Sequence, residues 1–217
     1  MGLPFQSMSG LHIASLFFLT MALTLSCISL VFPFVAWSNL QTDTRDGSFC
    51  FKQSIGLLSA EQCSCDLTDL KCFDVDLNAL PAGYDFYKLG GKVVLALILV
   101  SIGSLLGSIA VVFMRGGANA NNVRAPGYRN LKLFSSVSCL YTATLYLVAA
   151  SLWSSYINNE LNYGFSKQVK GVYSLGSGFY LNVASCFFVF GSAFVQMWTP
   201  ESSPDGYAPM KSKKSVS

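Results

Sequence analysis

Four long stretches of this sequence contain no charged residue, and they limit the fold more than any other feature. They cover residues 11–37, 93–114, 133–156 and 172–198. As a helix, each is long enough to cross a hydrocarbon core of about 30 Å, which takes about 20 residues. Only 12% of the chain is charged, about half the usual share for a soluble domain. We therefore expect an α-helical membrane protein with four transmembrane helices.

Individual residues in these stretches predict where the helices end and which of their faces pack against other helices. The first is too long for a cleaved signal peptide and has no basic segment before it, and Pro33 near its end predicts a kink or a stop. We expect His12 to be an interfacial side chain. Gly103 and Gly107 predict close approach of another helix. The third stretch should face a partner helix with a row of hydroxyl side chains: Ser135, Ser136, Ser138, Thr142 and Thr144.

The polar segment Ser38–Gly91 carries four of the seven cysteines. A metal site is disfavoured, because the only histidine is His12 and the spacing does not give two Cys-x-x-Cys pairs. Two disulfides in an oxidising compartment are favoured, with three pairings open. Residues 48–58 alternate as a strand does. The remaining cysteines lie in apolar stretches and should stay reduced. The four cysteines of the polar segment are Cys50, Cys63, Cys65 and Cys72.

The distribution of basic residues predicts the orientation. Residues 115–132 hold Arg115, Arg124, Arg129 and Lys132 without an acid, and the tail 199–217 holds three lysines. The positive-inside rule puts both segments in the cytosol. Both termini are then cytosolic, whereas residues 38–91 and 157–171 lie outside a plasma membrane. The cysteine argument leads to the same orientation independently.

Four places in the sequence resemble the claudin superfamily of tetraspan membrane proteins. These are Pro33 to Trp37, the run from Gly56-Leu57 to Cys63 and Cys72, Leu147 to Trp153, and Leu175 to Ser185. The superfamily includes peripheral myelin protein, the epithelial membrane proteins and the calcium-channel gamma subunits. The chain differs at Leu58, where claudins carry Trp, and at Asn182, where Gly is usual. The signature residues carried over are Trp37, Gly56, Leu57, Trp153 and Gly176.

The resemblance implies a fold and a disulfide pairing. The fold is a single domain over residues 1–217, a left-handed bundle of four transmembrane helices with a small disulfide-stapled extracellular β-sheet. The implied pairing joins Cys63 to Cys72, which leaves Cys50 for Cys65. In pore-forming claudins, acids just after the paired cysteines line the ion path. This implies a path for cations along Asp66 and Asp74.

Three functions remain open for such a protein. It forms cell–cell contacts, a barrier or a paracellular pore at cell junctions with itself or related tetraspans, in the same or a neighbouring membrane. Alternatively it is an auxiliary subunit of an ion channel or receptor, or a membrane-organising tetraspan. We expect no enzyme, cofactor or metal, because His12 and the acids of the 38–91 segment fall on opposite sides of the membrane. The small net charge of +3 argues against nucleic acid.

The tail contains a short pattern of its own. Tyr207-Ala208-Pro209-Met210 fits the Tyr-x-x-hydrophobic signal that clathrin adaptors read. Tyr207 and Met210 are therefore candidate sorting residues.

Overall fold

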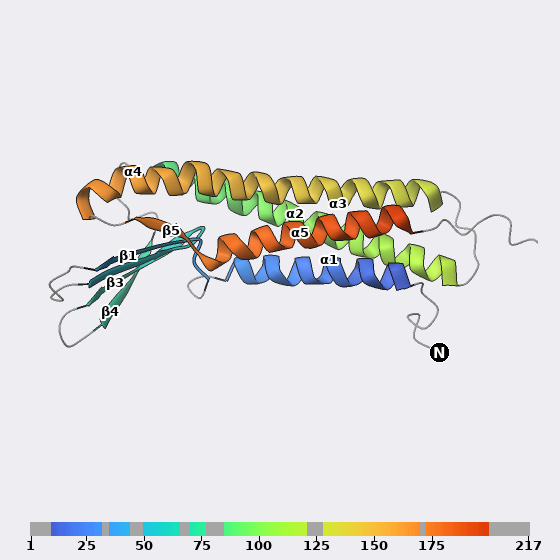
Figure 1. Cartoon of the computed structure of the whole chain (residues 1–217), viewed down its shortest axis with the longest axis horizontal. Helices are drawn as coiled ribbons and strands as arrows, with labels where there is room; N and C mark the ends of the chain where they lie inside the picture. Colours follow the sequence, from blue (N-terminus) through green and yellow to red (C-terminus); the bar gives the residue numbers. More distant parts are fainter. Residues whose placement is uncertain are drawn as a thin grey trace, which may run out of the picture.

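A computed structural model of the chain describes residues 10–31, 35–43, 50–65, 70–76, 85–120, 128–169 and 172–199. Among these residues, four helices are long and apolar enough to cross a membrane. They lie side by side in one bundle (Figure 1). The chain is therefore a multi-pass membrane protein, as the uncharged stretches predict. The helices are α1 (Gly10–Ser29), α2 (Asp85–Ala120), α3 (Tyr128–Ser151) and α5 (Ser177–Trp198).

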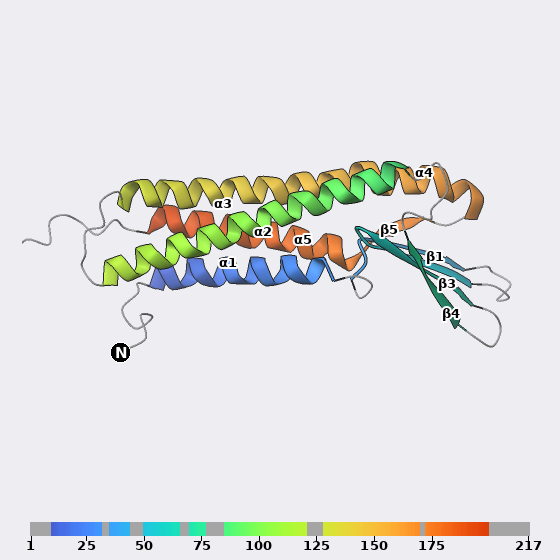
Figure 2. The ribbon, with the colours of Figure 1, turned by 180° about the vertical axis from the view of Figure 1, so that it is seen from behind.

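The described strands form one antiparallel sheet, in the order β4-β3-β2-β1-β5. It lies beyond one end of the bundle (Figures 1 and 2). We call this the sheet end, and the opposite end, where α1 begins and α5 ends, the far end. Four strands lie between α1 and α2, and the fifth directly precedes α5. They are β1 (Ser38–Asp43), β2 (Cys50–Ile55), β3 (Ser59–Cys65), β4 (Leu70–Asp76) and β5 (Tyr173–Leu175).

Two helices extend further than the uncharged stretches indicate. Helix α2 begins at Asp85, eight residues before Val93, and therefore includes Lys88 and Lys92. Helix α3 passes into a π-helical segment, η3 (Leu152–Ile157), and then into α4 (Asn158–Val169). Most of the predicted loop 157–171 is thus helical. Figure 1 shows α4 continuing past the bundle end beside the sheet. The backbone hydrogen bonds of a helix are made within the helix, so a helix can continue past the last apolar residue into water.

The other two helices are shorter than predicted. Helix α1 ends at Ser29, eight residues before Trp37. The Trp37 backbone N–H instead donates to the Ile55 carbonyl, at 2.7 Å, and so belongs to the sheet. Residues Tyr173–Leu175 form β5 against β1, so α5 starts at Ser177 rather than at residue 172. At Trp37 and at Tyr173–Leu175, backbone hydrogen bonds to the sheet take the place of helical hydrogen bonds.

Helices α2 and α3 meet through hydroxyl groups. Ser104 bonds Ser138 at 3.0 Å and accepts from Thr142 at 2.7 Å, and Ser108 donates to Ser138 at 3.0 Å. This confirms a partner helix for Ser138 and Thr142, whereas Thr144 is exposed and donates to the Leu140 carbonyl of its own helix. The prediction for Gly103 and Gly107 was wrong, because no described atom of another helix lies within 4 Å of where their side chains would be. The close approach runs through the adjacent serines.

The interior of the bundle combines apolar packing with a second hydroxyl cluster. Ser26 of α1 bonds the Tyr146 hydroxyl at 2.6 Å and Ser185 at 3.1 Å. The Asn182 amide donates to the Tyr146 carbonyl at 3.1 Å, so the deepest amide of α5 joins it to α3. Fully buried apolar side chains of all four helices form one core in the bundle: Leu19, Ala22, Val94, Ile98, Leu105, Ala143, Ala149 and Val189.

Candidate functional site

Three aromatic side chains hold the sheet to the helices. Trp37 lies just before β1, Trp153 in η3 and Tyr87 in the first turn of α2, and all three are buried. The ring centroids of Trp37 and Trp153 are 5.2 Å apart, and those of Tyr87 and Trp153 are 6.2 Å apart. Large rings in such tilted contacts contribute both apolar burial and specific geometry. We call this cluster the aromatic junction.

Each ring of the aromatic junction also has a polar partner. Trp37 Nε1 donates to the Ser29 carbonyl at 2.9 Å, at the end of α1. Trp153 Nε1 donates to Ser38 Oγ at 2.9 Å, and the Tyr87 hydroxyl donates to the Gly56 carbonyl at 2.6 Å. Buried Trp and Tyr need such partners, because a buried polar group without one is costly. The bonds connect α1, α2 and η3 to the sheet.

A chain of polar side chains extends the aromatic junction toward β5. Ser38 Oγ donates to Asn158 Oδ1 at 2.9 Å. The Asn162 side chain accepts from the Tyr173 backbone N–H at 2.6 Å and donates to its carbonyl at 3.2 Å. The Tyr173 hydroxyl donates to Gln53 Oε1 at 2.6 Å, on β2. Helix α4 is therefore fixed to the sheet by side-chain amides.

Two glycines permit the backbones to come this close. A Cβ at Gly91 of α2 would overlap the Leu57 carbonyl oxygen, and one at Gly176 would overlap the Ala36 carbonyl oxygen. Gly176 also donates its N–H to the Trp37 carbonyl at 2.8 Å. Both positions need a residue without a side chain because backbone atoms, which cannot swing aside, occupy the space.

The aromatic junction brings the signature residues together. Trp37, Gly56, Leu57, Trp153 and Gly176 come from four separate parts of the sequence and all lie in it or against it. The sequence analysis missed the residues that complete it. Two tyrosines, a glycine and three side-chain amides at these positions carry no periodic signal, so only the fold identifies them: Tyr87, Gly91, Asn158, Asn162, Tyr173 and Gln53.

The disulfide lies on the opposite face of the sheet. Cys63 of β3 and Cys72 of β4 are direct cross-strand partners and are joined by a disulfide, which confirms this pairing. Cys50 and Cys65 also lie opposite each other, on β2 and β3. Their side chains are outside the described part of the structure, so the second bond stays a prediction. Cys27, Cys139 and Cys186 are free thiols, as expected.

An acid pair stands beside this disulfide. Asp74, a predicted ion-path residue, is exposed on β4 directly opposite Glu61 on β3. The other predicted residue, Asp66, lies outside the described residues. The sequence analysis missed Glu61 because only the strand register makes it the partner of Asp74. The Glu61 carboxylate also lies near both cysteine sulfurs, but sulfurs in a disulfide are not thiolates and make poor metal ligands.

A second polar cluster lies at the far end, and all four spanning helices contribute to it. Arg115 of α2 donates to Ser135 Oγ of α3 at 3.0 Å, and Ser135 donates to Gln196 Oε1 of α5. Gln196 Nε2 donates to Ser192 Oγ at 3.1 Å, which bonds Ser15 Oγ of α1 at 2.8 Å. Arg115 is only 1% exposed. We call this set the far-end polar cluster.

His12 belongs to the far-end polar cluster rather than to the interface. It is 2% exposed and lies within electrostatic range of Arg115. The prediction of an interfacial side chain was wrong because His12 lies on the inward-facing side of the first turn of α1, whereas its neighbours Leu11 and Ile13 are exposed. The described acids lie at the sheet end, so the structure forms no His–carboxylate pair for acid–base chemistry among the residues that it describes.

No family model matches the sequence, and no curated protein matches it. The candidate sorting residues Tyr207 and Met210 lie outside the described residues. The candidate site is thus a polar sheet face that ring contacts and hydrogen bonds join to a four-helix membrane bundle.

Proposed function

We propose that this protein is a claudin-like contact protein of the plasma membrane, whose sheet lies outside the cell and joins copies of the protein in the same and neighbouring membranes. The observation that carries the proposal is the aromatic junction. Through Trp37, Trp153 and Tyr87 it fixes a small sheet rigidly beyond the bundle end. A surface that binds a partner on another cell benefits from this rigidity, because less conformational freedom is lost on binding.

Charge and cysteine chemistry support the orientation. Arg115 and Lys132 lie at the far end, where Lys132 Nζ donates to the Thr199 carbonyl at 2.8 Å. Basic residues favour the cytosolic side. The Cys63–Cys72 disulfide lies at the other end, and disulfides persist in oxidising compartments. An epitope on the C-terminus that antibodies reach without permeabilising the cells would contradict this orientation.

The outermost strand offers an apolar contact. Phe73 projects from β4, an edge strand of the sheet, and is 60% exposed. A large exposed aromatic residue on an unpaired strand edge suits association with another protein. It supports β4 as part of the contacting surface.

Co-culture of junction-free cells tests the contact function. Cells that express the protein are mixed with cells that do not, and its enrichment is measured at borders of each kind. We expect enrichment only where two expressing cells meet, with strands in freeze-fracture images. Phe73→Ser should weaken the enrichment, whereas the matched change Tyr163→Ser, at an exposed aromatic residue of α4, should not. Equal levels at both kinds of border would contradict trans contact.

A second candidate function is that of an auxiliary subunit of an ion channel. Exposed aromatic side chains recur along one side of α5 at seven-residue intervals, at Tyr180, Phe187 and Phe194, followed by Trp198. Such a row suits packing against another membrane helix as well as lipid. Co-purification of a large channel, combined with uniform distribution in the co-culture, favours this function.

Within the contact function, we infer a paracellular path that prefers cations. Glu61 and Asp74 face each other across β3 and β4, and directly opposed like charges destabilise a sheet slightly. Paired carboxylates raise the local concentration of cations. Asp66 follows β3 in the sequence and remains part of the proposed path.

Dilution potentials across a monolayer test the cation preference. Neutralising the acids with Glu61→Gln, Asp74→Asn and Asp66→Asn should lower the sodium-to-chloride permeability ratio. Lys52→Gln should raise it, because Lys52 lies on the same polar face, opposite Cys63. Glu160→Gln is the matched control, since this exposed acid lies on α4 rather than on the sheet. An unchanged ratio in the acid variants, with normal levels at contacts, would contradict the path and leave the contact function standing.

A further inference from the structure

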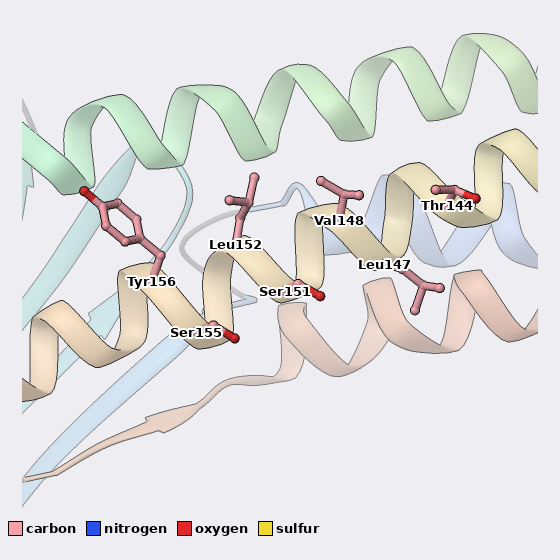
Figure 3. A pocket seen from close by; sticks show the side chains of 7 residues that line it. All are labelled: Thr144, Leu147, Val148, Ser151, Leu152, Ser155 and Tyr156. Atoms are coloured by element: carbon pink, nitrogen blue, oxygen red, sulfur yellow. The ribbon is translucent and has the colours of Figure 1, made fainter.

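A shallow hollow lies on the outer side of α3 and η3. Its volume is about 420 Å³, and seven residues line it. Figure 3 shows two rows of side chains, with Thr144, Val148, Leu152 and Tyr156 on one side and Leu147, Ser151 and Ser155 on the other. Members of each row are four residues apart, so the hollow is the groove between two adjacent ridges of one helix.

This groove faces lipid over its whole length. It lies inside the candidate span 130–163, and Tyr156 and Ser155 are exposed on the bundle surface. The polar residues Asn158 and Asn159 follow at once, and tyrosine is typical of the membrane–water interface. Ser155 and Tyr156 therefore mark the interfacial end of the groove. Thr144 lies about 18 Å deeper, at ~1.5 Å per residue.

The hydroxyl groups of the groove that have no partner among the described residues lie in its interfacial half. Thr144 donates its hydroxyl to the Leu140 carbonyl at 2.9 Å, so the deep end offers mainly apolar surface. The hydroxyls of Ser151, Ser155 and Tyr156 make no hydrogen bond to any other residue that the structure describes, so they are available to a ligand. No charged residue lines the groove. A ligand with an uncharged hydroxyl head and an apolar body matches this distribution.

The shape of the groove favours a rigid ligand over a flexible acyl chain. Its interfacial half coincides with the π-helical segment η3, and π-helical turns often occur at functional sites. The small side chains of Ser151 and Ser155 leave room beside the branched side chains of Leu147, Val148 and Leu152. A rigid, flat body fits between the two rows with less loss of conformational freedom than a flexible acyl chain.

We propose that this groove binds a sterol, with the sterol hydroxyl at Ser155 and Tyr156 and the ring system along Val148 and Leu152. A phospholipid suits it less, because a charged head group prefers basic side chains and none lines the groove. A second copy of the chain is the remaining occupant that the test must distinguish. The proposal does not depend on the contact function.

The test uses the purified full-length protein in phospholipid vesicles that contain a photoreactive sterol. We expect labelling of the peptide that contains residues 144–156, with competition by unlabelled sterol. Its epimer with the inverted hydroxyl should compete less. Ser155→Phe, which fills the groove, should reduce labelling about tenfold, and Tyr156→Phe, which removes only the hydroxyl, about threefold. The matched control is Thr24→Phe on the lipid-facing surface of α1, which should leave labelling unchanged.

Three results would overturn the proposal. The first is equal labelling of this peptide by a photoreactive phospholipid, without competition by sterol. The second is equal competition by both sterol epimers together with unchanged labelling of Tyr156→Phe. The third is cross-linking of residues 144–156 to a second copy of the chain that excludes the sterol probe.

Discussion

At the sheet end, two tryptophans and a tyrosine join the helices to the sheet, whereas at the far end a buried arginine, a serine and a glutamine join the helices to one another. Both clusters are closed to solvent. The aromatic junction buries large apolar surfaces, and its few polar atoms have partners. In the far-end polar cluster, the same enclosure surrounds the positive charge of Arg115, which donates to the Ser135 hydroxyl.

This difference predicts that the two clusters contribute differently to the stability of the fold and to the choice of one helix arrangement. Burial of an aromatic ring contributes free energy that is lost in full when the ring is removed. Burial of a charge carries a desolvation cost that offsets most of the gain from its hydrogen bonds. We therefore expect the aromatic junction to supply most of the stability. The far-end polar cluster would chiefly select one arrangement of the helices.

The largest effect should come from removing a ring of the aromatic junction. Trp153→Ala should lower the free energy of unfolding by about 3–5 kcal/mol, because it leaves a large cavity. The matched control is Trp198→Ala, since Trp198 is 71% exposed and leaves none. Denaturant unfolding in detergent micelles measures both variants. Equal losses in the two would contradict the distinction between the aromatic junction and the bundle surface.

The disulfide should come next, and its effect should stay at the sheet end. Cys72→Ala removes a link between residues nine apart in sequence, which is worth about 2–3 kcal/mol in the chain-entropy model. Hydrogen exchange should speed up in β3 and β4 and stay unchanged in the far half of α1. Cys27→Ala, at a free and exposed cysteine, serves as the control. Faster exchange throughout the bundle would show that the sheet and helices unfold as one unit.

A pair of glycines on α2 should give smaller effects of opposite sign. Gly91→Ala should destabilise the protein by about 1–3 kcal/mol, because its Cβ would overlap the Leu57 carbonyl oxygen. Gly103→Ala meets nothing within 4 Å and should stabilise it by about 0.5–1 kcal/mol, since alanine favours a helix. Thermal unfolding of the two variants measures the contrast. If Gly91→Ala is as stable as wild type, α2 does not approach Leu57 this closely.

The smallest effect is expected at the far-end polar cluster. Arg115→Met replaces the buried charge by a side chain of similar length and should leave the free energy of unfolding within about 1 kcal/mol of wild type, or raise it. Ser135→Ala removes two interhelical bonds, to Arg115 and to Gln196, and should cost about 1 kcal/mol, at ~0.6 kcal/mol for each bond. Cysteine cross-linking between α1 and α5 would report any loss of a unique helix arrangement. A loss of several kcal/mol in Arg115→Met would reverse the expected roles of the two ends.

The sequence by itself determined the four spans, the segment that holds four of the five strands and the reduced state of Cys27, Cys139 and Cys186. These properties follow from local composition, because the length of an uncharged stretch decides whether it crosses a membrane. It also indicated the signature residues and, by resemblance, the Cys63–Cys72 pair. The inference of the signature residues and that of the Cys63–Cys72 pair do not depend on how the helices are rotated about their axes.

Only the tertiary structure decided which side chains meet. Stretches apolar on every side do not reveal which face of a helix points inward, so the burial of His12 and the lipid exposure of Gly103 were missed. Strand register likewise made Glu61 the partner of Asp74. Helix ends shifted at Trp37 and Tyr173 because hydrogen bonds to distant strands replaced local helical ones. Each of these outcomes depends on contacts between residues far apart in the chain, which local composition does not encode.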